Sequence, residues 1–408
     1  MSLNATPSAE RVHIGIFGRR NAGKSSLINA LTSQDIAITS QQKGTTTDPV
    51  YKAMELLPLG PVMIIDTPGI DDEGELGEQR VSRAYQVLNK TDIALLVIDA
   101  AVGITPEDRR LWEHIMEKKI PSLLICNKCE LLSEMERALL TASALQLTSS
   151  CHFVSAVRNE KIKELKEAIA ALQPKEEEKE LIGDLLQPHD IVILVTPIDS
   201  AAPKGRLILP QQQVLRNVLD NNALALVVQE TELAAALEKL AVKPRIVVTD
   251  SQAFEKVSRI VPAGVPLTSF SILMARYKGS LYSAVKSVRA LDTIKDGDHI
   301  LISEGCTHHR QCQDIGTVKL PAWIRKFTGA EPEFSYTSGT GFPADLSPYK
   351  LIVHCGACML NEREVVYRSK CAADQGVPMT NYGIAIAYMH GILKRTVAPL
   401  PGIAELLE

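Results

Sequence analysis

One stretch decides the fold of the first part of this chain: Gly18-Arg19-Arg20-Asn21-Ala22-Gly23-Lys24-Ser25. Residues 11–17 before it are apolar and strand-like, and residues 26–31 after it have helical spacing. A loop of this kind between a strand and a helix is typical of phosphate binding, because its backbone N–H groups, the helix N-terminus and the lysine all face the phosphates. We therefore expect a nucleotide to be bound by Gly18, Asn21, Ala22, Gly23, Lys24, Ser25 and Ser26, with Lys24 also acting on the reacting phosphate.

The composition is that of an ordinary soluble globular protein. The chain has 408 residues, of which 45% are hydrophobic and 23% charged, and this length predicts two or three domains. A net charge of −4 disfavours a broad nucleic-acid-binding face. No apolar run reaches transmembrane length, and residues 1–10 lack the features of a signal peptide. We expect a cytoplasmic protein with neither a membrane nor a nucleic-acid partner.

Eight cysteines are distributed unevenly along the chain. In a cytoplasmic protein they are expected to be reduced, metal-bound or buried rather than paired in disulfides. Two of them, Cys312 and Cys371, fit no ligand pattern and are expected to pack as small apolar side chains. The others lie in an early group, Cys126, Cys129 and Cys151, and a late group, Cys306, Cys355 and Cys358.

Two segments after the phosphate loop predict a magnesium site. The segment Gly44-Thr45-Thr46-Thr47-Asp48 is polar, and we expect a mobile switch in which a threonine hydroxyl, that of Thr46 in preference to Thr45, completes the magnesium shell beside that of Ser25. Residues 62–65 form a short buried-strand pattern that runs into Asp66-Thr67-Pro68-Gly69. Asp66 suits outer-shell magnesium binding, and the backbone N–H of Gly69 suits the γ-phosphate.

Further strands and helices alternate as far as residue 172. Apolar runs at 93–98, 122–126 and 151–154 predict central parallel strands, and residues 161–172 predict an amphipathic helix. The alternation predicts a doubly wound α/β domain. Two short polar motifs follow the last two strands: Asn127-Lys128-Cys129-Glu130 and Ser155-Ala156.

In this order, the five segments resemble the signatures of small GTPase domains, and most of all those of the bacterial tRNA-modification and ribosome-assembly GTPases such as TrmE and Era. The resemblance implies that Asn127 and Glu130 read guanine, that Lys128 packs on the base, and that Ser155 and Ala156 complete the site. Glu130 departs from the aspartate that is usual there.

The same resemblance bears on GTP hydrolysis. Ile70 replaces the glutamine that Ras-like enzymes use to orient water, and several of the relatives instead use a potassium ion held partly by an asparagine at the position of Asn21. Alternatively, Asn21 only stabilises the loop. We expect slow basal hydrolysis of GTP to GDP and phosphate.

The middle of the chain reads as a second, smaller parallel α/β domain. Residues 174–183 are charged and predict a linker, and residues 184–268 hold three strand-like runs with helical segments between or after them. This part has no cysteine and no glycine-rich loop. We expect it to serve in self-association, giving a homodimer.

Residues 269–408 predict a third α/β domain with a metal centre. Strands are expected at 299–303 and 349–353, and each runs into a Cys/His motif; a third short segment is expected at 377–382, before a helix at 383–393. If the strands are parallel, both motifs lie at their carboxyl ends, where open α/β sheets build their sites. The candidate metal ligands are Cys306, His308, His354, Cys355 and Cys358, with Cys355 and Cys358 expected at the start of a helix.

Three kinds of site fit this set. A structural zinc ion would take three cysteines and a histidine, and a redox disulfide would use only Cys355 and Cys358. We favour the third, an iron–sulfur cluster held by Cys306, Cys355 and Cys358, which leaves one iron open to an exchangeable ligand. His308, His354 and Glu304 are candidates for that fourth position.

The order Cys-x-His, 45 residues, His-Cys-x-x-Cys, behind a GTPase-like segment, resembles the maturation GTPases of FeFe-hydrogenase, the HydF family. The resemblance implies a GTPase domain (1–173), a dimerisation domain (184–268) and a domain (269–408) that binds a 4Fe–4S cluster. It further implies a scaffold that receives a diiron precursor made with the radical-SAM enzymes HydE and HydG and delivers it to apo FeFe-hydrogenase. The alternative is a TrmE/Era-like tRNA or ribosome GTPase with a structural Cys3His zinc.

Overall fold

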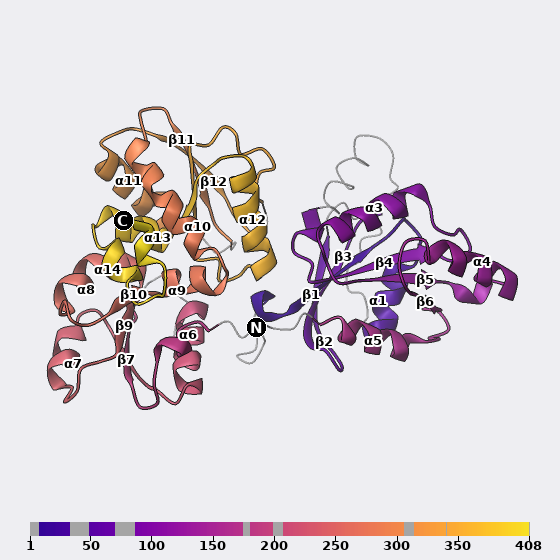
Figure 1. The fold of residues 1–408 in the computed structure, drawn as a ribbon, viewed down its shortest axis with the longest axis horizontal. Coiled ribbons are helices and arrows are strands. Elements are labelled where there is room, and N and C mark those ends of the chain that lie inside the picture. The colour runs from indigo at the N-terminus through magenta and orange to yellow at the C-terminus, as the bar shows by residue number, and fades with distance from the viewer. Residues whose placement is uncertain are drawn as a thin grey trace. The chain divides into compact units, whose positions relative to one another are not determined.

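The computed structural model describes residues 8–32, 49–69, 86–173, 180–198, 207–305, 314–339 and 341–407. The chain forms two compact units, Met1–Glu176 and Glu177–Glu408 (Figure 1). Several predicted features lie outside the described residues: the switch with Thr46, Ile70, most of the linker (174–179), Cys306, His308 and Cys312. In the part of the chain that the structure describes, no helix is long and apolar enough to span a bilayer.

The first unit contains a six-stranded sheet in the order β2-β3-β1-β4-β5-β6. All neighbouring strands are parallel except β2 and β3, which are antiparallel. Strands β1 and β4 pair at the point where the strand order reverses, and such a point opens a crevice for ligands at the carboxyl ends. The strands are β1 (Val12–Phe17), β2 (Val50–Leu56), β3 (Gly60–Asp66), β4 (Ile93–Asp99), β5 (Ser122–Asn127) and β6 (Cys151–Val154).

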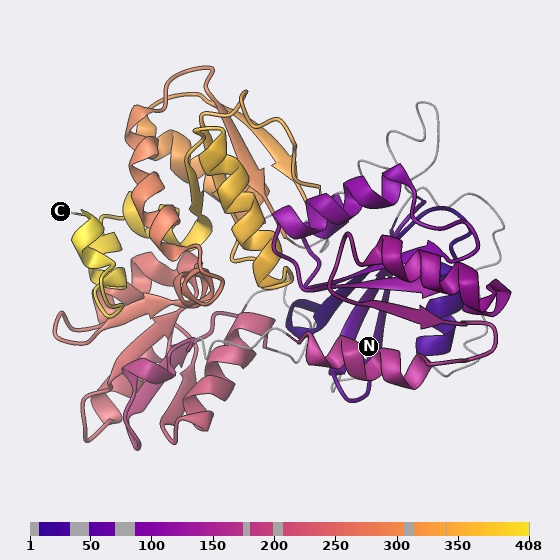
Figure 2. The ribbon, with the colours of Figure 1, turned by 45° about the vertical axis from the view of Figure 1, so that its right-hand side comes forward.

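Helices cover both faces of this sheet (Figure 2). The apolar faces of α1 (Lys24–Thr32) and α5 (Ile162–Ala171) pack on one side, and those of α3 (Pro106–Glu117) and α4 (Glu134–Ala144) pack on the other. The central strand β4 is buried on both faces, which explains its continuous apolar run. The predicted doubly wound fold is confirmed.

The second unit contains two four-stranded sheets, and both are entirely parallel. The first has the order β10-β9-β7-β8 and the second β12-β11-β13-β14. The strands of the first sheet are β7 (Ile191–Val195), β8 (Leu224–Val228), β9 (Ile246–Thr249) and β10 (Leu267–Ser269). Those of the second are β11 (His299–Ser303), β12 (Glu333–Thr337), β13 (Leu351–His354) and β14 (Met379–Asn381).

One apolar core joins the two sheets of the second unit. It contains side chains of β7 and β11 together with the almost fully buried helix α9, which follows β10 directly. The domain boundary that we expect after residue 268 therefore lies within a continuous core, and it stays a prediction. The helices are α6 (Leu209–Asp220), α7 (Leu233–Lys239), α8 (Phe254–Ile260), α9 (Phe270–Tyr277), α10 (Leu281–Ser287), α11 (Leu320–Thr328), α12 (Glu362–Asp374), α13 (Tyr382–Met389) and α14 (Leu393–Val397).

Short helical segments connect these elements. In the first unit they are Ser8–Glu10 and Cys129–Leu131, and in the second Gly183–Leu185, Ser251–Ala253, Val288–Thr293, Ala404–Leu407 and the π-helical turn Ile315–Lys319. Three strands escaped the sequence analysis: β2, β10 and β12. Strands β2 and β12 lie at sheet edges and are partly exposed, and β10 has only three residues, so none shows a continuous apolar run.

Candidate functional site

The phosphate loop connects β1 to α1 and depends on two glycines. Gly18 has φ +143°, and a Cβ there would lie 2.1 Å from the carbonyl oxygen of Val97. Gly23 has φ +89°, and a Cβ there would lie 2.2 Å from Nδ2 of Asn127. No larger residue can take either position without moving the loop. Between them, Asn21 is exposed with φ +60°, and Ala22 is buried.

Lys24 begins α1 and lies under the loop. Its ammonium donates to the carbonyl oxygens of Gly18 at 2.7 Å and Arg19 at 2.8 Å, and the residue is only 8% exposed. The next two residues, Ser25 and Ser26, are exposed on the first turn of the helix. The loop, the positive end of the helix dipole and this lysine form an arrangement suited to a polyphosphate.

The predicted magnesium residues Ser25 and Asp66 lie together. The Ser25 hydroxyl donates to Oδ2 of Asp66 over 3.1 Å. Burial raises the pKa of Asp66, while the Lys24 charge and the Ser25 hydrogen bond act in the opposite direction. A hydroxyl and a carboxylate are oxygen donors of the kind that Mg²⁺ prefers, so the pair fits that ion. Gly69 lies three residues beyond Asp66 and is partly buried.

Asn127 connects three of the predicted segments. It is the last residue of β5, is 2% exposed, and donates from Nδ2 to the carbonyl oxygen of Ala22 over 3.0 Å. Its Oδ1 accepts the backbone N–H of Ala156 at 3.1 Å. Ser155 is fully buried, and its hydroxyl accepts the backbone N–H of Arg158. The phosphate loop and the two later motifs are thus held at one place.

Two charged residues, Lys128 and Glu130, follow Asn127 along the chain. Lys128 has φ +65°, and its ammonium lies 2.5 Å from Oδ2 of Asp99. Glu130 lies in the short helical segment that follows, and its Oε2 is buried without a hydrogen-bond partner. A buried carboxylate oxygen in this condition is rare in proteins. Two N–H donors on a ligand, as guanine presents, would satisfy it.

The second candidate site is at the carboxyl end of β13. The backbone N–H of Cys355 donates to Ser303 O at the end of β11 over 2.9 Å. The sulfur of Cys355 accepts the N–H of Gly305 at 3.0 Å and that of Ala357 at 3.4 Å. Gly305, the described residue just before Cys306, therefore lies at the same sheet edge as Cys355. Backbone N–H groups aimed at a sulfur fit a thiolate that binds iron.

Cys358 lies beside Cys355 in the same turn. Burial and, to a smaller extent, the neighbouring Cys355 raise its pKa to about 11, although the charge of Lys278 and the N–H groups of Cys358 and Met359 act in the opposite direction. A buried thiol of this kind binds a proton unless a metal ion takes the proton's place. Within the described ranges no three His, Cys, Asp or Glu side chains form a metal group; Cys306 is outside them.

The two cysteines are not at the start of a helix as predicted. Ala357, between them, has φ +56°, which interrupts a right-handed helix. Helix α12 begins only at Glu362, where the Asn361 side chain accepts the N–H of Glu364 at 3.1 Å. The Cys-x-x-Cys motif therefore lies in a loop, and backbone N–H groups rather than a helix N-terminus face its sulfurs.

The candidates for the fourth position differ in their surroundings. His354 is 2% exposed, with Nδ1 2.8 Å from Cys355 O and Nε2 3.1 Å from Nη1 of Arg368. Glu304 is 6% exposed at the end of β11 and accepts a hydrogen bond from the Tyr382 hydroxyl at 3.3 Å. Both lie at the same sheet edge as Cys355.

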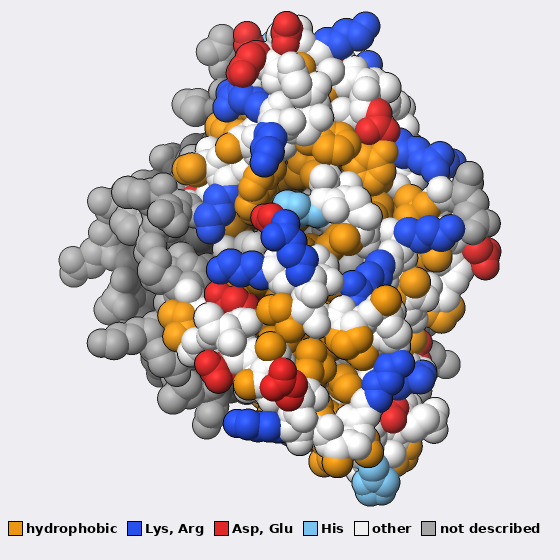
Figure 3. Space-filling view, turned by 90° about the vertical axis from the view of Figure 1, so that its left-hand side faces the viewer, with side chains coloured by type: hydrophobic (Ala, Val, Ile, Leu, Met, Phe, Trp, Pro, Cys, Tyr) orange, Lys and Arg blue, Asp and Glu red, His pale blue; other side chains and the backbone are white. Residues whose placement is uncertain are grey.

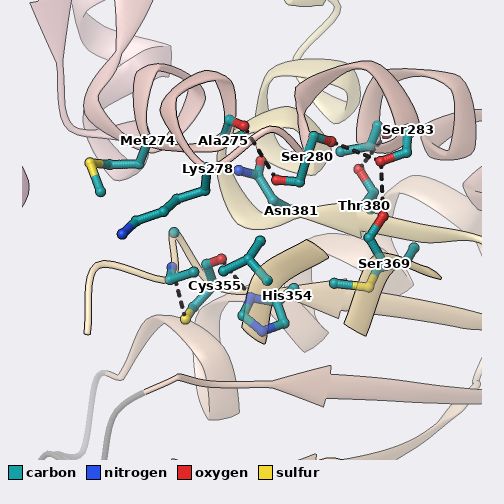
Figure 4. A pocket seen from close by; sticks show the side chains of 15 residues that line it. Met274, Ala275, Lys278, Ser280, Ser283, His354, Cys355, Ser369, Thr380 and Asn381 are labelled. Atoms are coloured by element: carbon teal, nitrogen blue, oxygen red, sulfur yellow. Dashed lines mark hydrogen bonds between the residues drawn. The ribbon is translucent and has the colours of Figure 1, made fainter. Parts of the chain in front are cut away.

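Sequence reasoning missed Lys278, Arg368 and Tyr382. Lys278 follows α9, is 3% exposed and lines a small pocket beside Cys355, with its side chain directed toward the Cys355 loop (Figure 4). It lies 77 positions before Cys355 in the sequence and belongs to no motif. Only the fold, which packs α9 against β14 and α13, brings it there.

The first unit is similar in sequence to known bacterial GTPases. Residues 13–128 match the family model of the 50S ribosome-binding GTPase. GTPase Der of Maridesulfovibrio salexigens is 35% identical over 154 residues, and tRNA modification GTPase MnmE of Synechococcus elongatus is 37% identical over 159 residues. These matches cover 36% and 39% of this chain and 34% of each relative, so the chain spans about a third of the length of these curated relatives.

Solved structures with low sequence identity are similar as well. Era in complex with MgGDPNP and 16S ribosomal RNA is 20% identical with a TM-score of 0.36, over 53% of this chain and 93% of that chain. The FeoB G-domain of Methanococcus jannaschii is 23% identical with a TM-score of 0.30, over 40% of this chain and 97% of that chain. The family model and the curated relatives show that the first unit is a GTPase domain.

The second unit matches two models of a single family. Residues 181–279 match the hydrogen maturase F dimerization domain, and residues 282–399 match the hydrogen maturase F tetramerization domain. With the GTPase match, these two matches follow one another along most of the chain, and the GTPase and dimerization domains stand in the order that the resemblance to the HydF family implies. By this architecture, the chain belongs to the hydrogen maturase F (HydF) family.

Proposed function

We propose that this protein is a GTP-hydrolysing scaffold that binds a 4Fe–4S cluster and assembles or delivers the diiron precursor of FeFe-hydrogenase. The observation that carries the proposal is the sulfur of Cys355, which accepts two backbone N–H groups at a sheet edge in a HydF-type domain. One of those groups belongs to Gly305, the residue before Cys306. A GTPase domain precedes this site in the same chain.

The nucleotide part of the proposal assigns roles to the residues of the first unit. Lys24 and the loop residues Gly18 and Asn21–Ser26 would bind the phosphates, and Asn127, Lys128, Glu130, Ser155 and Ala156 would hold the guanine. Ser25 and Asp66 would bind Mg²⁺ with Thr46, and Gly69 would donate its N–H to the γ-phosphate. Asn21 is exposed on the loop and could contribute to a potassium site.

The cluster part of the proposal uses Cys306, Cys355 and Cys358 as ligands. Three cysteines hold a cubane cluster and leave one iron with an exchangeable position, where cargo can bind and leave. His308, His354 and Glu304 are the candidates for that position. The cargo would come from the radical-SAM enzymes HydE and HydG and pass to apo FeFe-hydrogenase. We further propose that ordering of the 44–48 segment by GTP changes partner association.

Self-association is expected from the second unit, since both of its matched domains are oligomerization domains. Strand β8 lies at the edge of its sheet, with Leu224 54% and Val227 39% exposed. An exposed apolar edge strand is a template for pairing with another chain. Figure 3 shows a face of this unit on which apolar side chains lie exposed between lysines and arginines. We propose a homodimer that uses the β8 edge.

Anaerobic reconstitution with iron and sulfide tests the proposed function. The protein should take up iron, turn brown and give an EPR signal when reduced. Each of the variants Cys306→Ser, Cys355→Ser and Cys358→Ser should bind less iron than the unchanged protein. Cys371→Ser, on α12, is the matched control and should bind as much iron as the unchanged protein. Stoichiometric zinc without cluster uptake would instead favour the tRNA or ribosome GTPase with a structural zinc.

A second measurement tests the GTPase part separately. Lys24→Ala should abolish GTP turnover, because the phosphate charge would lose its partner in the loop. The variant should bind the same amount of iron as the unchanged protein. A loss of both properties together would contradict the division of labour between the two units.

A further inference from the structure

Arg368 is the largest fully buried side chain of the described residues, and its charge is paired. It lies on α12 one turn after Glu364, whose Oε1 accepts from Nε at 2.8 Å and from Nη2 at 2.7 Å. A buried guanidinium is tolerated only when its charge is balanced and its N–H donors are bound. Glu364, itself 3% exposed, balances the charge and leaves other donors of Arg368 for other partners.

Those other donors reach three neighbouring strands. Nη2 donates to the carbonyl oxygen of Gly339, two residues after β12, at 2.8 Å. Nη1 donates to the Ser303 hydroxyl at the end of β11 at 3.3 Å and approaches Nε2 of His354 at the end of β13 at 3.1 Å. Arg368 therefore fixes the sheet edge that carries Cys355.

The contact with Arg368 determines the tautomer of His354. A guanidinium can only donate, so Nε2 must be the ring nitrogen that carries the lone pair and accepts. The proton of the neutral ring is then on Nδ1, which donates to the carbonyl oxygen of Cys355 over 2.8 Å. Figure 4 shows His354 next to Cys355. Both ring nitrogens are thus engaged within the protein.

We propose that His354 is a positioning residue that ties the Cys355 backbone to Arg368, and that it is not a ligand of the cluster. The inference rests on the proposed function, because it presupposes that a cluster is bound at Cys355. An imidazole binds iron through a lone pair, and the lone pair of His354 is directed at a buried, immobile cation. The exchangeable iron position is then left to a group other than His354.

Three substitutions of His354 separate positioning from ligation. In His354→Asn the amide N–H takes the place of Nδ1–H and can still donate to Cys355 O. In His354→Gln the amide oxygen takes the place of Nε2 and can still accept from Arg368. His354→Ala loses both bonds. None of the three offers an imidazole nitrogen to iron, so a ligand role would be lost in all of them.

The experiment uses the full chain after anaerobic reconstitution with iron and sulfide. Pulsed EPR on the reduced cluster should give the same nitrogen couplings in the unchanged protein and in His354→Asn. Release of iron to a chelator should be several-fold faster in His354→Ala than in the unchanged protein, and intermediate in His354→Asn and His354→Gln, which each keep one of the two bonds. A strong nitrogen coupling that is present in the unchanged protein and absent from His354→Asn would overturn the proposal.

Isotope labelling provides a test that does not depend on a substitution of His354. Labelling with ¹⁵N-histidine should leave the couplings unaltered unless another histidine, such as His308, binds iron, and His308→Ala distinguishes that case. A histidine coupling that persists in His308→Ala would contradict the proposal. If no cluster assembles at all, the proposed function fails, which is a different result from a cluster with His354 as ligand.

Discussion

Asn127 and Ala22 are joined by a hydrogen bond of 3.0 Å from the Asn127 amide to the Ala22 carbonyl oxygen, although they lie 105 positions apart. Through its Oδ1, the same side chain also holds the N–H of Ala156. One buried amide thus connects the phosphate loop with the segments that are expected to bind guanine. Its contribution to the site is architectural as well as chemical.

Asn127→Ala should weaken the binding of GDP and GTP alike. The change leaves the Ala22 carbonyl oxygen and the Ala156 N–H without their partner, and a lost buried hydrogen bond costs about 1–3 kcal/mol. We expect a roughly 5- to 150-fold higher dissociation constant, measured with a fluorescent guanine nucleotide. Asn29→Ala, at an exposed position on α1, is the control. Equal affinities for the two variants would contradict the prediction.

Glu130→Gln should reduce the preference for guanine over adenine nucleotides. The buried Oε2 of Glu130 has no partner in the structure, and a guanine N–H pair would supply two donors. An amide can accept only one of them, so the loss is expected to be about tenfold or more for GDP, by the cost of one charged hydrogen bond. ATP binding should not change. Glu134→Gln, on the exposed first turn of α4, should leave both affinities as they are.

The sequence predicted most of the GTPase domain because its signals are local. The strands β1, β3, β4, β5 and β6 are apolar runs. The phosphate loop and the motifs at 66–69, 127–130 and 155–156 lie at the carboxyl ends of β1, β3, β5 and β6, which places them at one edge of a parallel sheet. Pairing partners were not needed for that inference. The edge strand β2 was missed because its residues alternate between exposed and partly buried, so it shows no apolar run.

The proposed cluster site was only partly predictable, because its contacts join residues that lie far apart in the sequence. Cys355 and the end of β11 could be brought together from two strand patterns, and the 2.9 Å bond from Cys355 N to Ser303 O agrees with that expectation. Arg368 lies among charged and polar residues of α12, a pattern that predicts an exposed side chain, yet it is fully buried. Its burial depends on Glu364 and on three strand ends, which no local pattern reveals.

Arg368→Met should strongly destabilise the second unit. The variant leaves Glu364 buried without its cation, and breaking a buried pair costs about 3–5 kcal/mol. The double variant Glu364→Leu/Arg368→Met should recover much of this loss, because no buried charge remains. Urea unfolding monitored by circular dichroism measures both.

The matched control for this pair is Arg259→Met. Arg259 and Glu255 on α8 have the same i,i+4 spacing, with side chains 76% and 58% exposed. A surface pair contributes about 0–1 kcal/mol, so the control should change the unfolding midpoint little. Similar losses for the two arginine variants would contradict the role assigned to burial.

Cys126 should resist alkylation and should make the GTPase domain sensitive to high pH. Burial raises the pKa of its thiol well above the usual value of 9.0, and the neighbouring Cys151 adds to the shift. The folded state therefore holds the proton more tightly than the unfolded state. Its contribution to stability is complete below pH 9 and is lost as the pH rises toward the folded pKa.

Two measurements check this behaviour. Iodoacetamide at pH 8 should label Cys126 only after denaturation, as read by mass spectrometry of the peptides. Thermal unfolding between pH 8 and 11 should show a smaller loss of stability in Cys126→Ala than in the unchanged protein. Labelling of Cys126 in the native protein at the rate of a free thiol would contradict the prediction.

Lys278→Met should make the cluster harder to reduce. Lys278 is buried in the pocket beside Cys355, and its charge lowers the pKa of Cys358, so its field reaches the sulfurs. In the proposed cluster site, reduction would add a negative charge beside three thiolates, and a cation in a low-dielectric pocket stabilises that charge. Removing it should shift the reduction potential in the negative direction, as measured by an EPR-monitored redox titration.

Lys278→Arg keeps the charge and should leave the potential near that of the unchanged protein, whereas Lys286→Met on α10 controls for a general change in surface charge. Equal potentials for Lys278→Met and the unchanged protein, with equal iron content, would show that the ammonium does not act on the cluster.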